Sequence, residues 1–66
     1  MKAKEIRDLT TDEVIEKIEI EEEKYSKMRL NHAVASLENP VQLRQQRKFI
    51  ARLKTDLRNR QLNEKN

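Results

Sequence analysis

The sequence predicts an all-α fold, an antiparallel two-helix hairpin over about residues 11–35 and 40–62, with a short basic N-terminal arm. Both long segments are rich in helix-forming residues and contain no glycine and no internal proline. Pro40 separates them, because a proline lacks the amide donor that would continue the first helix. The connection is then about four residues long, and so short a loop favours antiparallel neighbours. A chain of 66 residues has room for one domain, residues 1–66.

The first helix has a well-marked start. Thr10 is the predicted N-cap, and Glu13 completes a capping box in which each side chain binds the other residue's backbone amide. Leu9 and Val14 have the spacing of a hydrophobic staple across this start. Two pairs of opposite charge at i,i+4 spacing are expected to support the helix: Glu13 with Lys17, and Glu23 with Lys27.

The predicted inward face of the first helix is not uniformly apolar. At 100° per residue, one stripe contains Val14, Ile18, Tyr25, Met28 and His32. Glu21 falls on the same stripe and interrupts it. We interpret His32 and Tyr25 as packing residues, because a two-helix hairpin offers no pocket in which a histidine would act as base or ligand.

The second helix begins with the residues that end the first. Asn39 is the predicted N-cap, Pro40 the first helical residue and Gln42 the N3 partner. Residues 63–66 are expected to fray at the other end. The apolar stripe of this helix contains Leu43, Gln46, Ile50, Leu53 and Leu57, with Phe49 at its edge.

A basic face adjoins this apolar stripe. Six cations fall within an arc of roughly 160° on the helical wheel: Arg44, Arg47, Lys48, Arg52, Lys54 and Arg58. No acid of the second helix lies within this basic face, and arginine, which suits bidentate contact with phosphate, outnumbers lysine. Ala51 lies inside the face, where its small side chain would let a nucleic-acid backbone approach closely. We predict that the basic face binds nucleic acid, and a merely solvated surface is the alternative.

Charge in the rest of the chain is consistent with a polyanionic partner. The net charge of +3 is divided unevenly: residues 1–38 carry seven cations and ten anions, and residues 39–66 carry eight cations and two anions. The arm is expected to be mobile and to bring a second basic group to the polyanion: Lys2, Lys4 and Arg7. Its apolar residues, Ile6 and Leu9, are expected to tuck against the open end of the hairpin. Arg29 either extends the basic surface onto the first helix or is an ordinary surface residue.

The composition excludes several kinds of site. Without cysteine there is no disulfide, thiolate metal site or cysteine nucleophile, which suits a reducing, intracellular compartment. Without glycine there is no phosphate-cradling loop. The acidic run of the first helix spreads around the axis and predicts a solvated face instead of a metal site: Glu19, Glu21, Glu22 and Glu23. We expect no enzyme, cofactor, metal or small-molecule substrate, and neither a signal peptide nor a membrane span.

Some apolar residues have no place in a two-helix seam. Ile20, Leu30, Val34 and Phe49 cannot all face it, and together they indicate apolar contact with another molecule. This pattern favours the alternative interpretation of the chain, a free-standing helical-hairpin adaptor that binds proteins. The basic face, which has no acid of its own helix within it, favours nucleic acid.

Several motifs, RKFIARLKT at 47–55 and NHAVASLENP at 31–40 among them, together resemble the bacterial family of large-subunit ribosomal protein twenty-nine, and the match covers nearly the whole chain. Residues 47–55 (RKFIARLKT) closely resemble the signature of its second helix and are the most specific part of the match. The start of the chain, residues 1–7 followed by 9–10 and 13–14, and the MRL triplet at 28–30 also fit, and residues 31–40 (NHAVASLENP) are similar to the Bacteroidetes branch. Gln46 departs from the family, which usually has an aliphatic residue there, so the seam is either locally polar or shifted in register.

This resemblance implies a non-enzymatic, structural protein of the large ribosomal subunit, in the cytoplasm. It implies a helical hairpin held against 23S ribosomal RNA at the rim of the polypeptide exit tunnel, beside ribosomal protein twenty-three. Trigger factor and the signal recognition particle dock at that rim. The residues that match motif positions are the leading RNA contacts, Arg47, Lys48, Arg52 and Lys54, followed by Lys2, Lys4 and Arg7.

Overall fold

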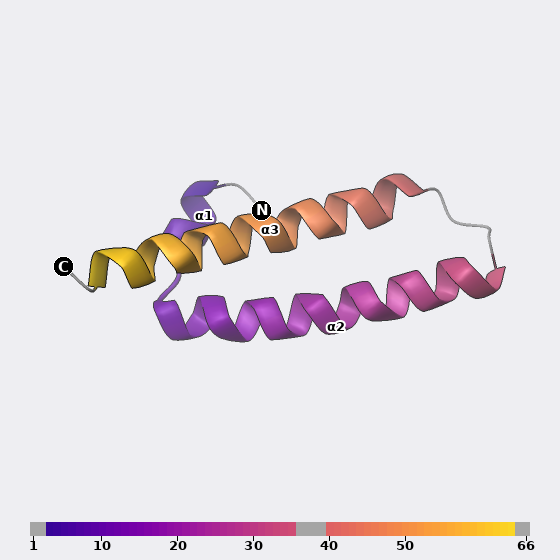
Figure 1. Cartoon of the computed structure of the whole chain (residues 1–66), viewed down its shortest axis with the longest axis horizontal. Helices are drawn as coiled ribbons and strands as arrows, with labels where there is room; N and C mark the ends of the chain where they lie inside the picture. Colours follow the sequence, from indigo (N-terminus) through magenta and orange to yellow (C-terminus); the bar gives the residue numbers. More distant parts are fainter. Residues whose placement is uncertain (1–2, 36–39, 65–66) are drawn as a thin grey trace.

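The computed structural model describes residues 3–35 and 40–64. Three helices lie within these ranges: α1 (Ala3–Arg7), α2 (Thr11–Ala35) and α3 (Pro40–Glu64). The two long helices lie side by side and antiparallel, and the molecule is a rod that measures 47 × 18 × 15 Å (Figure 1). The predicted all-α hairpin is therefore confirmed.

The helix boundaries agree closely with the sequence pattern. α2 has the predicted bounds, and α3 begins at Pro40 as predicted. α3 ends at Glu64, two residues later than expected, so residues 63 and 64, which were expected to fray, belong to the helix; residues 65 and 66 lie outside the described residues. The predicted N-cap Asn39 and the connection at 36–39 lie outside the described residues.

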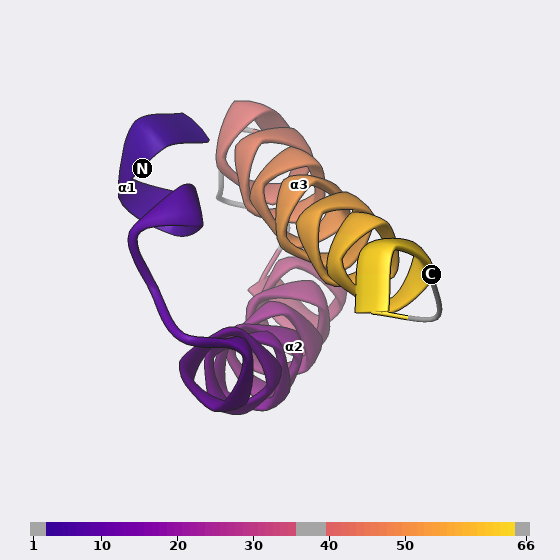
Figure 2. The same cartoon turned by 90° about the vertical axis from the view of Figure 1, so that its left-hand side faces the viewer.

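The N-terminal segment differs from the mobile arm that the sequence predicted. Residues 3–7 form α1, which lies beside α3 (Figure 2). In this view along the rod, α1 and α3 both lie above the start of α2. A single helical turn is unstable alone in water, because nucleation fixes many dihedral angles for one hydrogen bond. Ile6 supplies the missing stabilisation, since its side chain is 3% exposed and joins the core. The expectation that Ile6 and Leu9 tuck against the hairpin is confirmed.

The core is concentrated where α1 meets the hairpin, and we call this region the docked end. Ile6, Val14, Ile18 and Leu53 form one buried cluster, and both Val14 and Leu53 are fully buried. Leu9, Phe49 and Leu57 pack against this cluster. Phe49 is therefore half-buried, and its predicted role as an exposed apolar contact is wrong, because packing at the docked end covers it.

The opposite end of the hairpin is less well buried. We call residues 25–34 of α2 and 41–45 of α3 the hinge end. The predicted stripe continues there, but its members are only half-buried: Tyr25, Met28, His32 and Leu43. Leu30 and Val34 lie on the outer face and are 64% and 80% exposed, as predicted, and Ile20 is exposed as well. Among the described residues, no third helix covers this end of the stripe, which stays partly open to water.

The start of α2 has the predicted capping box. The Thr10 amide donates to Glu13 Oε1 at 2.9 Å, and the Glu13 amide donates to Thr10 Oγ1 at 3.2 Å. The hydrogen bond from the Thr10 amide lowers the pKa of Glu13 below its ordinary value. Lys17 does not pair with Glu13 as predicted; its Nζ lies 3.5 Å from Glu21 Oε1 instead. The predicted pair of Glu23 and Lys27 is present at 3.5 Å.

The seam between α2 and α3 is locally polar at Gln46, which was one of the two explanations for this residue; the other was a shift in register. Gln46 Nε2 donates to Glu21 Oε2 at 2.6 Å and to the Glu21 carbonyl oxygen at 3.1 Å. The hydrogen bond from Gln46 lowers the pKa of Glu21, although burial opposes this. The expectation that the whole acidic run is solvated is wrong for Glu21, which is 6% exposed, because the helical period turns it into the seam.

Candidate nucleic-acid interface

The basic face of α3 is turned away from the core. Leu53 packs with Val14 and Ile18 of α2 and Ile50 is buried one turn before it, and this packing fixes the rotation of α3 about its axis. All six cations of the basic face are exposed. From Arg44 to Arg58 they extend over about 21 Å, at 1.5 Å per residue. The packing of the apolar stripe thus presents a row of cations along one side of the rod.

One member of the basic face has a partner within the chain. Lys54 Nζ lies 3.1 Å from Glu22 Oε2 of α2, and both side chains are about half exposed. The face is free of acid on its own helix, as predicted, but α2 brings an acid to its edge. An exposed pair of this kind contributes little stability, so a phosphate can compete for the lysine. Among the described residues, the other five cations make no ion pair: Arg44, Arg47, Lys48, Arg52 and Arg58.

Arg29, the candidate contact on α2, has a local aromatic partner. Its guanidinium carbon lies 5.9 Å from the centroid of the Tyr25 ring, within the range of a cation–π interaction. Arg29 is exposed at the hinge end, so its donors remain accessible, and its contact with RNA stays a prediction.

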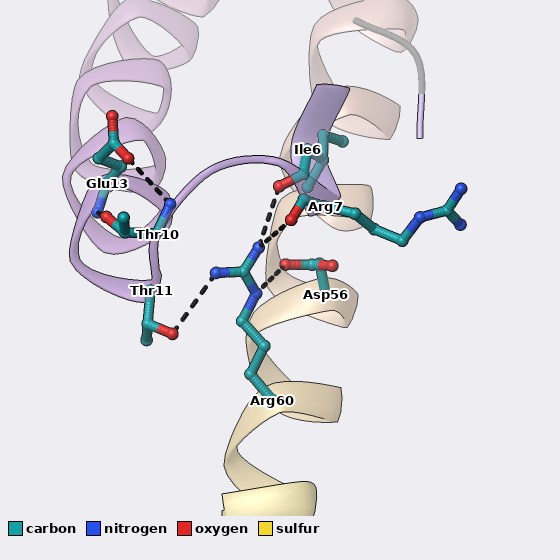
Figure 3. Close-up of polar contacts among 7 residues, drawn as sticks. All are labelled: Ile6, Arg7, Thr10, Thr11, Glu13, Asp56 and Arg60. Carbon is teal, nitrogen blue, oxygen red and sulfur yellow. Dashed lines mark hydrogen bonds and ion pairs between the residues drawn. The ribbon is translucent and has the colours of Figure 1, made fainter. Parts of the chain in front are cut away.

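The basic residues of the N-terminal segment lie on a docked helix. Lys4 and Arg7 belong to α1 and are exposed, and Lys2 lies outside the described residues. The Arg7 side chain points away from the polar cluster that holds its backbone (Figure 3). α1 therefore presents cations on a surface that the hairpin supports, instead of on a free arm.

Arg60 holds α1 in place, and the sequence pattern gave it no role. Its Nη2 donates to the Ile6 carbonyl oxygen at 3.0 Å and to the Arg7 carbonyl oxygen at 3.3 Å (Figure 3). Its Nη1 donates to Thr11 Oγ1 at 3.4 Å, at the start of α2. Its Nε forms an ion pair with Asp56 Oδ2 at 2.6 Å. One guanidinium thus ties α3 to both of the other helices.

The chemistry of Arg60 follows from the end of α1. The last carbonyl oxygens of a helix have no partner within it, and cationic donors satisfy them well. Arg60 and Asp56 are each 18% exposed, so the ion pair between them is shielded from water. Their i,i+4 spacing, with Arg60 outside the basic face, was the one signal in the sequence. The carbonyl acceptors could not be foreseen, because α1 was not predicted.

A groove of about 360 Å³ lies between α1 and α3. Ile6 and Ala51 contribute apolar surface to its lining, and Arg7 and Arg52 contribute one cation from each helix. Thr55, Asp56 and Asn59 supply polar groups from α3. Ala51 was predicted to admit a close approach of the nucleic-acid backbone, and the structure shows that its small side chain leaves space for this groove.

Two other kinds of site are not found in the described part of the chain. No group of three or more histidine, aspartate or glutamate side chains there is arranged to hold a metal ion. No helix between residues 3 and 64 is long and apolar enough to cross a membrane.

Comparisons with known proteins give a consistent result. The sequence model of the family described as Ribosomal L29 protein matches residues 4–60. The chain is 48% identical over 65 residues to the large ribosomal subunit protein uL29 of Bacteroides thetaiotaomicron, covering 98% of this chain and 100% of that protein. It is 50% identical over 62 residues to the protein of the same name from Geobacillus stearothermophilus, covering 94% of each. No solved structure matches the chain.

Proposed function

The chain belongs to the Ribosomal L29 protein family, and from this premise we propose that it is a structural protein of the large ribosomal subunit that holds ribosomal RNA on the basic face of α3. It is not an enzyme, since the family is one of structural ribosomal proteins. As a ribosomal protein it works in the cytoplasm, in the ribosome.

The exposed basic face is the observation that supports RNA binding. Its cations lie on one side of a helix whose opposite side is fixed by the buried core. The helix fixes the spacing of these cations, so the backbone needs no further ordering when phosphates bind, and only the side chains lose rotamer freedom. Double-stranded RNA is recognised largely by its shape and its backbone, so this mechanism needs no base-reading code.

The proposed RNA contacts come from all three helices. α3 contributes the basic face and the small residue inside it: Arg44, Arg47, Lys48, Ala51, Arg52, Lys54 and Arg58. Lys2, Lys4 and Arg7 contribute from the N-terminal segment, and Arg29 from α2. We rank Lys54 below the other members of the basic face, because its ion pair with Glu22 must open before it binds a phosphate.

The proposed location is the rim of the polypeptide exit tunnel, against 23S ribosomal RNA and beside ribosomal protein twenty-three, where trigger factor and the signal recognition particle dock. This finer proposal is supported by the resemblance of residues 47–55 to the family signature. Exposed Ile20, Leu30 and Val34 on α2 offer apolar surface for a protein neighbour in such a site. Family membership argues against a free-standing adaptor as the alternative use of this surface.

Charge reversal on the basic face tests the proposal. We expect Arg44→Glu combined with Arg47→Glu to abolish co-sedimentation with large ribosomal subunits, because two attractive contacts become repulsive. The matched control is Lys24→Glu combined with Lys27→Glu, which makes the same change in net charge on exposed positions of α2. An adaptor that binds proteins through α2 would show the reverse pattern, with the α3 variant retained and the α2 variant lost.

The dependence on salt gives a second, quantitative readout. If about six phosphates are contacted, the logarithm of affinity for a ribosomal RNA fragment should fall with the logarithm of salt concentration at a slope of about −4 to −5. An affinity that is nearly flat between low and moderate salt would contradict the electrostatic mechanism.

A further inference from the structure

We propose that the groove between α1 and α3 binds one unpaired nucleotide of RNA, an inference that rests on RNA binding by the basic face. The base would lie against Ala3 and Ala51, which are exposed and line the groove, and the phosphate would be held between Arg7 and Arg52. The groove would then add recognition of one nucleotide to a surface that otherwise binds RNA by charge and shape.

The size of the groove limits what can occupy it. Its volume of about 360 Å³ is at the lower end of the range for small-ligand sites, about 300–1,000 Å³. A nucleic-acid duplex is far too wide to enter such a space, whereas one nucleotide displaced from a loop or bulge is small enough. Sequence-specific recognition of RNA is directed mostly at such unpaired nucleotides.

The charges around the groove favour an anionic occupant. Arg7 of α1 and Arg52 of α3 both line it, so cations approach from both walls. Arg52 also belongs to the basic face, which makes the groove continuous with the surface that we assign to the RNA backbone. A strand that follows the basic face would therefore reach the groove without leaving a positive environment.

The lining of the groove also suits a base. Ala3 and Ala51 supply exposed apolar surface for its ring, and the planar guanidinium groups of the two arginines provide surfaces on which bases stack. Thr55 and Asn59 carry a hydroxyl and an amide that can hydrogen-bond the edge of a base. The groove thus combines the two requirements of nucleotide binding, an apolar surface and polar groups beside it.

The two walls of the groove are held together by Arg60. Asp56 lines the groove, and its carboxylate is fixed by the ion pair with Arg60 Nε at 2.6 Å. The same guanidinium donates to the carbonyl oxygens of Ile6 and Arg7, two of the three lining residues contributed by α1. The groove is therefore formed before RNA arrives, and a preformed site loses less conformational entropy on binding.

The test compares two labelled RNA hairpins that differ only by one unpaired, bulged nucleotide, each titrated with the full-length chain by fluorescence anisotropy. We expect the bulged hairpin to bind about tenfold more tightly, the order of magnitude of one stacked base. Ala51→Leu fills the groove without changing charge, so the ratio of its affinities for the two hairpins should fall to about one, whatever its affinity for the paired hairpin. Ala33→Leu makes the same substitution at an exposed position of α2 and should preserve the preference.

The possible results separate this inference from the proposed function. Salt-dependent binding of both hairpins with equal affinity would overturn the groove site and leave RNA binding intact, as would full preference in Ala51→Leu. Absence of salt-dependent binding to either hairpin would overturn both proposals. Should Ala51→Leu lose its helical circular dichroism, the wild-type methyl signals of Ala3 and Thr55 decide: they should shift with the bulged hairpin and not with the paired one.

Discussion

The two ends of the hairpin share one apolar stripe but differ in how well it is buried. At the docked end, Val14 and Leu53 are fully buried, and Ile6 of α1 joins them. At the hinge end, Met28 and Leu43 occupy equivalent positions of the stripe but are only half-buried. The difference shows that burial is decided here by the number of packed elements, since two helices alone do not enclose a side chain.

This comparison also separates stability from binding surface. A core residue contributes most when its surface is fully removed from water, so the docked end must supply most of the free energy of folding. The hinge end keeps large apolar side chains on its outer face, Leu30 and Val34 among them. A surface of this kind gains stabilisation when a neighbour covers it.

The largest effect is expected when a leucine of the apolar stripe is shortened to alanine at each end of the hairpin. We expect Leu53→Ala to lower the free energy of unfolding by about 2–5 kcal/mol, because it leaves a cavity in a fully buried site. A chain of this length has only roughly 3–10 kcal/mol in total, so the variant should be largely unfolded. Thermal unfolding followed by circular dichroism measures the loss.

Leu43→Ala is the matched substitution at the hinge end. Because Leu43 is already half-exposed, we expect a loss of about 1 kcal/mol. Equal losses for the two variants would show that the two ends are equally important for stability and would break the comparison.

The second test removes the contact that fixes α1. Arg60→Ala deletes the donors to the Ile6 and Arg7 carbonyl oxygens and leaves Asp56 without its partner. We expect a loss of about 1–3 kcal/mol, together with detachment of α1. Amide hydrogen exchange should therefore accelerate in residues 3–9 more than in the middle of α2.

Two control variants sharpen this result. Arg58→Ala removes an exposed arginine two residues before Arg60. Its effect on the free energy of unfolding should stay within about 0.5 kcal/mol. Arg60→Lys keeps the charge but loses the planar fork, so it should rescue only part of the stability. Full rescue by lysine would mean that charge alone, without the several directed hydrogen bonds, holds α1.

Much of the fold was predictable because helical periodicity is a strong signal. The stripe through Val14 and Ile18, the capping box at Thr10 and the start of α3 at Pro40 all follow from spacing within one helix. The exposure of the basic face follows in the same way, since it lies beside the stripe that packs inward. Local pattern was therefore sufficient wherever one helix determines the outcome.

The features that were missed depend on contacts between helices. α1 has too few residues to be stable alone, so its existence depends on Ile6 reaching the core. The ion pair of Lys54 with Glu22 joins α3 to α2, and no pattern within α3 reveals it. The groove needs both α1 and α3, so neither helix predicts it by itself. Phe49 was misjudged for the same reason, because its burial depends on the packing of the docked end.

The smallest test concerns the polar pair that separates the two ends, Glu21 with Gln46. Gln46 lowers the pKa of Glu21 below that of an unfolded glutamate, so the ionised carboxylate stabilises the fold. This contribution is fully present above the ordinary glutamate pKa, about 4.3, and is lost as the pH falls through that value towards the lowered pKa. Glu21→Gln cannot titrate, so its stability should decline less steeply in acid than that of the wild type.

Urea midpoints measured from pH 7 down to the onset of acid unfolding would show the effect. We expect Glu21→Gln to be less stable than the wild type by about 1 kcal/mol at neutral pH, with the two curves converging in acid. Glu23→Gln is the control, because Glu23 is exposed and its ion pair with Lys27 is largely solvated. Parallel curves for Glu21→Gln and wild type would mean that the carboxylate adds nothing beyond a neutral hydrogen bond. In that case, side-chain shape alone would separate the docked end from the hinge end. If the two curves converge in acid, the charged contact between Glu21 and Gln46 helps to fix the seam.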